Sequence, residues 1–129
     1  MKDKLIKILI ADDDEGNINF LRLTFAEKYQ ILLARDGQEA LEILENLEAH
    51  QDIKVIITDQ RMPNMSGVEL LERSLDTHPQ ALHIIVTGYP DLNGLKERLE
   101  KIHIHKTFFK PLTDQRIDEM IRYIEENTN

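Results

Sequence analysis

The feature that most constrains the fold is a regular alternation of two hydrophobic patterns along 129 residues. The longer stretches carry apolar residues three or four positions apart, as on one face of a helix; Ile18, Leu21 and Phe25 are the first example. Between them lie short runs rich in β-branched residues, with the length of buried strands. These runs are Leu5–Ala11, Ile31–Ala34, Val55–Thr58, His83–Thr87 and Thr107–Phe109. The sequence therefore predicts five successive β-α units.

This alternation also predicts the topology. A chain that passes repeatedly from strand to helix to strand needs right-handed crossovers, which build a parallel sheet with helices on its faces. We predict a doubly wound α/β fold, a five-stranded parallel sheet flanked by five helices, in one domain over residues 1–129. The stretch 89–101 has the weakest helical pattern, because Pro90, Asn93 and Gly94 stand among few apolar residues.

The balance of charge and the absence of cysteine exclude several classes of function. Sixteen Lys and Arg against 24 Asp and Glu give a net charge of −8, which disfavours direct binding to nucleic acid or to an anionic membrane surface. Without cysteine there is no disulfide, thiolate zinc site or cysteine nucleophile. The first apolar run contains Lys7 and ends at Asp12, so it is too short and polar for a signal peptide or membrane span. We expect a cytoplasmic protein.

Chemically reactive side chains follow four of the predicted strands. The first strand runs into Asp12–Asp14, the third into Asp59, the fourth into Thr87 and the fifth into Lys110. Because parallel strands end at one edge of a sheet, these side chains are expected to converge. Each has an ordinary structural interpretation when taken alone: the acidic run is a good helix N-cap, Thr87 a strand end and Lys110 part of a surface turn. Only the complete set predicts a functional site.

Crowded carboxylates indicate a metal ion at this edge. At a separation of about 4 Å they repel each other by on the order of a few kcal/mol per pair, so a cation is needed beside them. Oxygen ligands without cysteine or a histidine pair favour Mg²⁺. We expect Asp13, Asp59 and the backbone carbonyl of Arg61 to bind it directly, with Asp12 acting through water.

The same residues can accept a phosphoryl group. The Asp59 carboxylate can act as the nucleophile. Lys110 would balance charge on the transferring oxygens, and the Thr87 hydroxyl would donate a hydrogen bond to one of them. Gly88 is expected to keep the approach open. A cis Lys110–Pro111 bond is predicted, because an X-Pro bond loses little free energy in cis and the bend would aim the lysine inward.

These residues stand in the segments ILIADDDE, VIITDQRMPNMSGVELLE, IIVTGYPD and FFKPLT. In order and spacing, the segments resemble the receiver domain of two-component response regulators, including the single-domain chemotaxis regulators, from about Ile6 to Ile124. The resemblance implies a flavodoxin-like receiver fold. It also implies roles for individual residues: Asp12 and Asp13 as the acidic pair, Asp59 as the phosphorylation site, Thr87 as the switch hydroxyl and Lys110 as the family's lysine.

The resemblance further implies a phosphorelay function. Asp59 would receive its phosphoryl group from a phosphohistidine of a sensor histidine kinase or histidine phosphotransfer protein, with Mg²⁺ as cofactor. The chain would be a signalling phosphoacceptor that promotes its own phosphorylation and dephosphorylation, with no separate enzymatic activity. The phosphorylated state would be read by a downstream protein partner or by a fused output domain.

Three positions bear on the switch and on the lifetime of the phosphorylated state. Arg61 and Tyr89 stand two residues after the acceptor and two after the switch hydroxyl, where family members tune the hydrolysis of the acyl phosphate. The switch region is expected to contain Gly88 and Thr107. Thr107 is a departure, because the family usually carries Tyr or Phe there as a gate that turns inward.

Three other classes of protein were weighed against the receiver domain. A Mg²⁺-dependent hydrolase with an aspartate nucleophile usually needs a second acid two residues later, where Arg61 stands. A flavodoxin-like cofactor binder needs a first loop that cradles phosphate, which Asp12–Asp14 would repel. A receiver-like interaction module that acts without phosphorylation stays open because of Thr107.

Several histidines and methionines received a structural interpretation. His83, His103 and His105 lack a third ligand at metal-binding spacing, and we expect them to be partly exposed. Met62 and Met65 are expected to fill the loop after Asp59.

Overall fold

The computed structural model describes residues 5–46, 52–88, 94–102, 104 and 106–128. Strands and helices alternate along the chain as the sequence predicts. The strands are β1 (Ile6–Ala11), β2 (Tyr29–Ala34), β3 (Ile53–Asp59), β4 (Leu82–Thr87) and β5 (Lys106–Phe109). The helices are α1 (Glu15–Phe25), α2 (Gly37–Asn46), α3 (Gly67–Thr77), α4 (Leu95–Lys101) and α5 (Asp114–Asn127).

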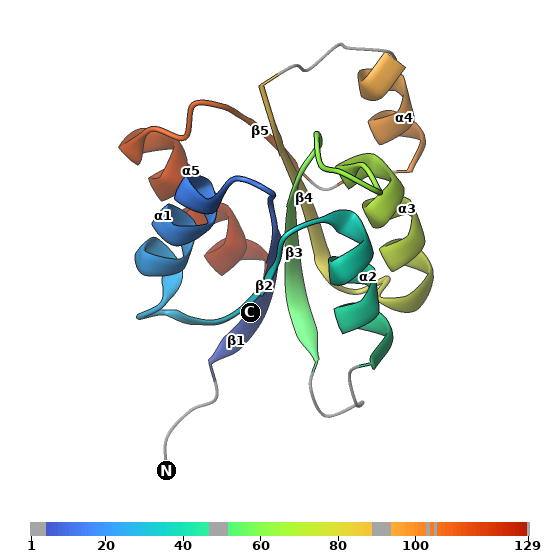
Figure 1. Ribbon diagram of the computed structural model, residues 1–129. Helices are drawn as coiled ribbons and strands as arrows, with labels where there is room; N and C mark the ends of the chain where they lie inside the picture. The colour runs from blue at the N-terminus through green and yellow to red at the C-terminus, as the bar shows by residue number, and fades with distance from the viewer. Residues whose placement is uncertain (1–4, 47–51, 89–93, 103, 105, 129) are drawn as a thin grey trace.

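The five strands form one parallel sheet in the order β2-β1-β3-β4-β5. Helices α1 and α5 cover one face, and α2, α3 and α4 cover the other (Figure 1). This arrangement confirms the predicted doubly wound α/β fold with five strands and five helices. Among the described residues, no helix has both the length and the apolar character needed to span a bilayer.

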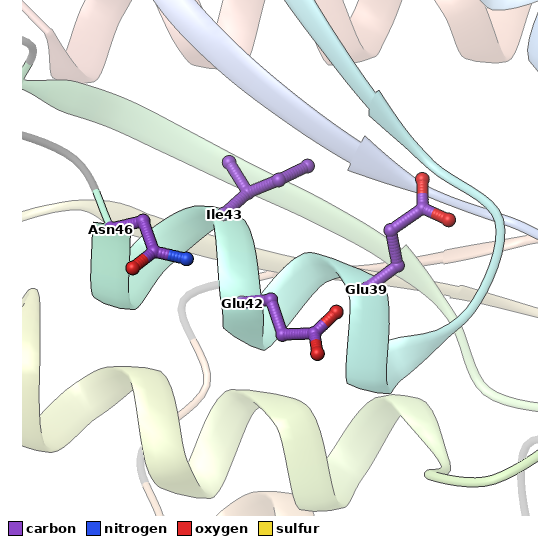
Figure 2. Close-up of a pocket in the computed structure, with 4 residues that line it drawn as sticks. All are labelled: Glu39, Glu42, Ile43 and Asn46. Atoms are coloured by element: carbon purple, nitrogen blue, oxygen red, sulfur yellow. The ribbon is translucent and has the colours of Figure 1, made fainter.

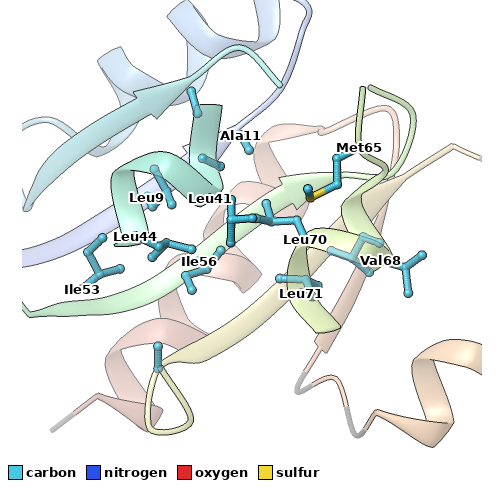
Figure 3. Close-up of a cluster of buried hydrophobic side chains, with 14 of the residues drawn as sticks. Leu9, Ala11, Leu41, Leu44, Ile53, Ile56, Met65, Val68, Leu70 and Leu71 are labelled. Atoms are coloured by element: carbon cyan, nitrogen blue, oxygen red, sulfur yellow. The ribbon is translucent and has the colours of Figure 1, made fainter. Parts of the chain in front are cut away.

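The core consists of two apolar layers, one on each side of the sheet. Successive side chains of a strand point to opposite faces, so Ile8 and Ile10 of β1 pack beneath α1 and α5, whereas Leu9 packs toward α2 and α3. Figure 3 shows Leu9 and Ile56 of the second layer among residues of α2 and α3. Burial on both faces explains why the strands are continuous apolar runs without polar alternation.

The strands end at or within one residue of the predicted ends, but four of them begin earlier than predicted, β4 by one residue at Leu82. β2 starts at Tyr29, which pairs with Ile6 across the sheet and packs edge-on against Phe25, with 5.8 Å between ring centroids. β3 and β5 start at Ile53 and Lys106, where polar residues mask the strand pattern. Pairing with a neighbouring strand therefore extends these strands beyond their apolar runs.

Two interpretations of buried side chains were wrong. His83 is fully buried because helices cover both faces of β4; its Nδ1 lies 2.8 Å from the Ala81 carbonyl oxygen and its Nε2 2.7 Å from Ser74 Oγ. Met65 is part of the core layer under α2 and α3 and does not merely fill a loop (Figure 3). Met62 packs against the same layer. His103 and His105 lie outside the described residues.

The parallel arrangement gives the two edges of the sheet different contents. The carboxyl ends of β1, β3, β4 and β5 all meet at one edge, where the predicted site residues lie. β1 begins and α5 ends at the opposite edge (Figure 1). The predicted site residues are thus separated from the beginning of β1 and the end of α5 by the length of the strands.

Candidate functional site

Three carboxylates gather at the carboxyl edge of the sheet. Each of Asp12, Asp13 and Asp59 offers an oxygen atom, and these atoms lie within 4.8 Å of one another. The register explains the approach, because Ala11 of β1 pairs with Thr58 of β3, so the next residues of the two strands are neighbours. Asp12 is 4% exposed and Asp59 is 9% exposed, whereas Asp13 faces solvent.

Backbone amides orient the two buried carboxylates. The Asp14 amide donates to Asp12 Oδ1 at 2.9 Å, and the Gln60 amide donates to Asp59 Oδ1 at 2.8 Å. Asp14 itself is the N-cap of α1, and its side chain accepts a hydrogen bond from the Asn17 amide at 3.0 Å. The acidic run thus combines both interpretations, because Asp14 begins the helix while its two predecessors belong to the carboxylate cluster.

Lys110 brings a positive charge to this cluster from the far side of the sheet. Its Nζ lies 3.1 Å from Asp59 Oδ2 and 3.7 Å from Asp12 Oδ2. Its backbone amide donates to the Thr87 carbonyl oxygen at 3.0 Å. The Lys110–Pro111 peptide bond is cis, as predicted. The fifth strand therefore delivers its lysine to carboxylates that belong to the first and third strands.

The charges of Lys110 and the neighbouring carboxylates shift the pKa values of Asp12 and Lys110. Burial raises the pKa of Asp12, and the charge of Asp59 acts in the same direction against the hydrogen bond from Asp14 and the charge of Lys110. Burial lowers the pKa of Lys110, but the charges of Asp59 and Asp12 outweigh it and raise that pKa, so the ammonium stays charged. The Lys110 ammonium thus forms ion pairs with Asp12 and Asp59, and Asp13 adds a third carboxyl group to the cluster. An all-oxygen cluster of this size and charge fits Mg²⁺.

Thr87 and Gly88 complete this edge of the sheet. Thr87 ends β4, is 1% exposed and pairs with Phe109 of β5. A β-carbon built on Gly88 would meet only the Lys110 Cβ, at 3.9 Å, which is ordinary contact. A methyl group therefore fits there, and obstruction by a larger side chain stays a prediction.

The remaining predicted residues are Arg61, Thr107 and Tyr89. Arg61 lies in the exposed loop between Asp59 and α3. Thr107 is half-buried on β5, where it pairs with Ile85. Tyr89 is not among the described residues. The structure therefore brings together Asp12, Asp13, Asp59 and Lys110, with Thr87 at the adjoining strand end.

Sequence reasoning missed the residues that fix the loop after Asp59 against α3. The Gln60 side-chain oxygen accepts from the Val68 amide at 2.8 Å, and its backbone oxygen accepts from the Gly67 amide at 3.0 Å. Gly67 is so close that a β-carbon there would lie 2.2 Å from the Asp59 carbonyl oxygen. The capping box of Ser66 and Glu69 was readable in the sequence, but no local pattern points to Gln60.

An open hollow lies on α2, away from the carboxylate cluster. Figure 2 shows its lining residues, Glu39, Glu42, Ile43 and Asn46. None of them belongs to the carboxylate cluster, and the two glutamates are exposed. Asp12, Asp13, Asp59 and Lys110 therefore lie at the sheet edge and not in this hollow.

Comparison with known proteins decides the family. A family model described as the response regulator receiver domain matches residues 8–122, a stretch that contains every site residue described above. The chain belongs to this family. The resemblance inferred from its motifs is thereby confirmed, and this receiver domain is a signalling domain of the response-regulator class.

Relatives of this receiver domain include short and long proteins. Sporulation initiation phosphotransferase F of Bacillus subtilis is 30% identical over 125 residues, which cover 95% of this chain and 97% of that protein. The hydrogenase transcriptional regulatory protein HoxA of Cupriavidus necator is 29% identical over 122 residues, or 95% of this chain and 24% of that protein. The receiver domain thus spans about a quarter of the length of the hydrogenase regulators that it matches.

Solved structures agree with this assignment. A CheY-like response regulator receiver domain protein from Methanospirillum hungatei superposes with a TM-score of 0.84 at 27% identity, covering 96% of this chain and 97% of that one. A signal receiver domain of an HD domain-containing protein from Pseudomonas fluorescens gives 0.83 at 27% identity, with 97% and 98% covered. These two receiver domains therefore share the fold of this chain over nearly its whole length.

Proposed function

We propose that this receiver domain accepts a phosphoryl group on Asp59 in a Mg²⁺-dependent reaction, as part of a two-component system. The observation that carries the proposal is the Lys110 ammonium 3.1 Å from the Asp59 carboxylate, beside the cluster of three acids. The donor is a phosphohistidine on a sensor histidine kinase or a histidine phosphotransfer protein. The proposed domain extends over residues 1–129 and acts in the cytoplasm.

In the proposed reaction, a carboxylate oxygen of Asp59 attacks the phosphorus atom of the phosphohistidine. A new O–P bond forms, the N–P bond breaks, and the imidazole nitrogen leaves with the electron pair, its charge balanced by a ring proton. The Gln60 amide and the Lys110 ammonium hold the two oxygens of Asp59 at 2.8 and 3.1 Å, so the nucleophile is oriented before the donor arrives.

Charge is balanced by groups that the fold places beforehand. Asp12, Asp13, Asp59 and the Arg61 carbonyl would hold Mg²⁺, which would neutralise negative charge on the phosphoryl oxygens. Lys110 supplies a further positive charge 3.1 Å from Asp59 Oδ2. The Thr87 hydroxyl, at the adjoining strand end, donates to a phosphoryl oxygen in the product.

The proposed output surface lies on α4, β5 and α5. Thr87 is connected to β5 by its pairing with Phe109 and by the hydrogen bond from the Lys110 amide. A movement of Thr87 toward the phosphoryl group would therefore pull on β5 and the loop after it. With Thr107 in place of an aromatic gate, we propose that the backbone and a helix shift, and that the change reaches the surface formed by residues 92–101, 106–109 and 117–126. A downstream protein or a fused output domain reads this change.

Two residues are proposed to set the lifetime of the acyl phosphate. Arg61 lies in the exposed loop after Asp59, from which its side chain can reach the solvent side of the acceptor. Tyr89 follows Gly88 in the sequence, where an aromatic ring could shield the acyl phosphate from water.

Intact mass spectrometry tests the proposal. Acetyl phosphate with Mg²⁺ should add one phosphoryl group to the wild type, and Asp59→Asn or a chelator should abolish the gain. Asp52→Asn is a matched control, because Asp52 is an exposed aspartate at the opposite edge of β3. Full labelling of Asp59→Asn would contradict the assignment of the acceptor. A wild type that takes no label would favour the interaction module that acts without phosphorylation.

A further inference from the structure

Arg116 of α5 holds the backbone on both sides of Lys110. Its Nη1 donates to the Phe109 carbonyl oxygen at 3.0 Å and to the Pro111 carbonyl oxygen at 2.8 Å. These two residues immediately precede and follow the lysine. A single guanidinium nitrogen with two protons therefore bridges the bend that carries the proposed charge-balancing residue.

The rest of this loop is attached to fixed elements as well. The Lys110 amide donates to the Thr87 carbonyl oxygen at 3.0 Å, which anchors the loop to β4. On the other side, Thr113 is the N-cap of α5, and its hydroxyl accepts from the Arg116 amide at 3.1 Å. Arg116 is thus fastened to the helix start by its backbone while its side chain reaches back to the loop.

The chemistry of the contact suits a positioning role. Hydrogen bonds from a charged donor are stronger than neutral ones, and the planar guanidinium sets their direction. Lys110 reaches Asp59 through a long, flexible side chain, so a change in its backbone position moves Nζ relative to the carboxylate. Displacement of a reacting or charge-balancing group by about 1 Å can reduce a rate by about 100-fold.

We propose that Arg116 is a positioning residue for Lys110, acting through the two carbonyl groups that flank the lysine. It does not touch the acceptor carboxylate or the phosphoryl group. The effect on the phosphorylation rate rests on the proposed function, whereas the effect on the loop itself is independent of it. The two parts can therefore be tested separately.

The first test is amide hydrogen exchange at Lys110, whose amide is bonded to Thr87. Arg116→Met should accelerate exchange at this amide by about tenfold, because it removes two hydrogen bonds from the loop. Exchange of the core amides of β3 should accelerate no more than the change in the global free energy of unfolding requires. Arg116→Lys keeps the charge and the donor protons and should restore most of the protection.

The second test is the rate of phosphorylation by acetyl phosphate with Mg²⁺. Arg116→Met should lower the maximal rate by about five- to twentyfold without weakening Mg²⁺ binding, since the acids that would hold the metal do not contact Arg116. Arg122→Met is the matched control for charge, on an exposed position of the same helix. Ile124→Val is the control for stability, because it shortens a fully buried side chain of α5.

Each outcome bears on a different part of the inference. Unchanged Lys110 exchange in Arg116→Met, or loss of rate equal to that of the stability-matched Ile124→Val, would overturn the positioning role. Slow phosphorylation that Arg116→Lys rescues would support it. If the wild type takes no phosphoryl group, the proposed function fails, while faster Lys110 exchange in Arg116→Met would still establish the contact to the loop.

Discussion

Replacing Gly67 by alanine would test how closely α3 is pressed against the acceptor loop. The new methyl carbon would lie 2.2 Å from the Asp59 carbonyl oxygen and 2.9 Å from the carbonyl carbon. Both are backbone atoms, so no side-chain rotation relieves the clash. The start of α3 must move away from Asp59, and the hydrogen bond from the Gly67 amide to the Gln60 carbonyl oxygen is lost with it.

The size of the effect follows from these contacts. Overpacking in a closely packed site costs about 1–3 kcal/mol. The lost backbone hydrogen bond adds about 0.5–1.5 kcal/mol, and the lower chain entropy of alanine in the unfolded state returns about 0.4–1 kcal/mol. The free energy of unfolding should therefore fall by about 0.5–4 kcal/mol. Urea unfolding followed by circular dichroism would measure it as a lower midpoint with an unchanged m-value.

Gly88→Ala is the internal control, since its β-carbon would meet only the Lys110 Cβ at 3.9 Å. Its free energy of unfolding should equal that of the wild type or exceed it by up to about 1 kcal/mol, because the lower chain entropy of alanine is not offset by a clash. If Gly67→Ala were as stable as the wild type, or if the two alanine variants lost equal stability, the close approach between α3 and the acceptor loop would be refuted.

Three further predictions concern the site residues. Because burial raises the pKa of Asp12, ionisation of this carboxyl group above its ordinary pKa of 3.8 lowers the stability of the folded state. Asp12→Asn should therefore raise the free energy of unfolding at neutral pH. A gain in stability that did not shrink on acidification would contradict this prediction. Asp13→Ala should weaken Mg²⁺ binding and raise the metal-free melting temperature by about 1–4 °C, whereas a lower melting temperature would favour a helix-capping role. Thr87→Ala should suppress the amide chemical-shift response of residues 94–102 and 106–109 to beryllofluoride; an intact response would refute transmission through Thr87.

The sequence predicted the fold because its apolar runs are long enough to be read without knowledge of their partners. It predicted the convergence of Asp12, Asp59 and Lys110 for a related reason, since parallel strands bring their carboxyl ends to one edge. The cis bond before Pro111 followed from the need to aim a lysine inward. These predictions depend on topology, which hydrophobic periodicity encodes directly.

The failures concern contacts between residues that no period relates. His83 was expected to be partly exposed, yet it is buried with Ser74, a small polar residue of α3 that gives no local signal of its partner. Gln60 and Arg116 act through hydrogen bonds to backbone groups, and such bonds impose no requirement on the identity of the residue that supplies the backbone group. Their importance is visible only once the loops have been placed.

The beginning of β1 and the end of α5 share the edge opposite the carboxylate cluster (Figure 1). A fluorophore, an immobilising tag or a neighbouring domain attached at either end would therefore lie at the edge of the sheet opposite the carboxylate cluster. Such an attachment would leave Asp59 open to a macromolecular phosphoryl donor. A fused domain would also keep the receiver domain at a high local concentration near its fusion partner. Sensors built on this domain should for that reason tolerate fusions at both ends, provided that the loops at the reactive edge are left free.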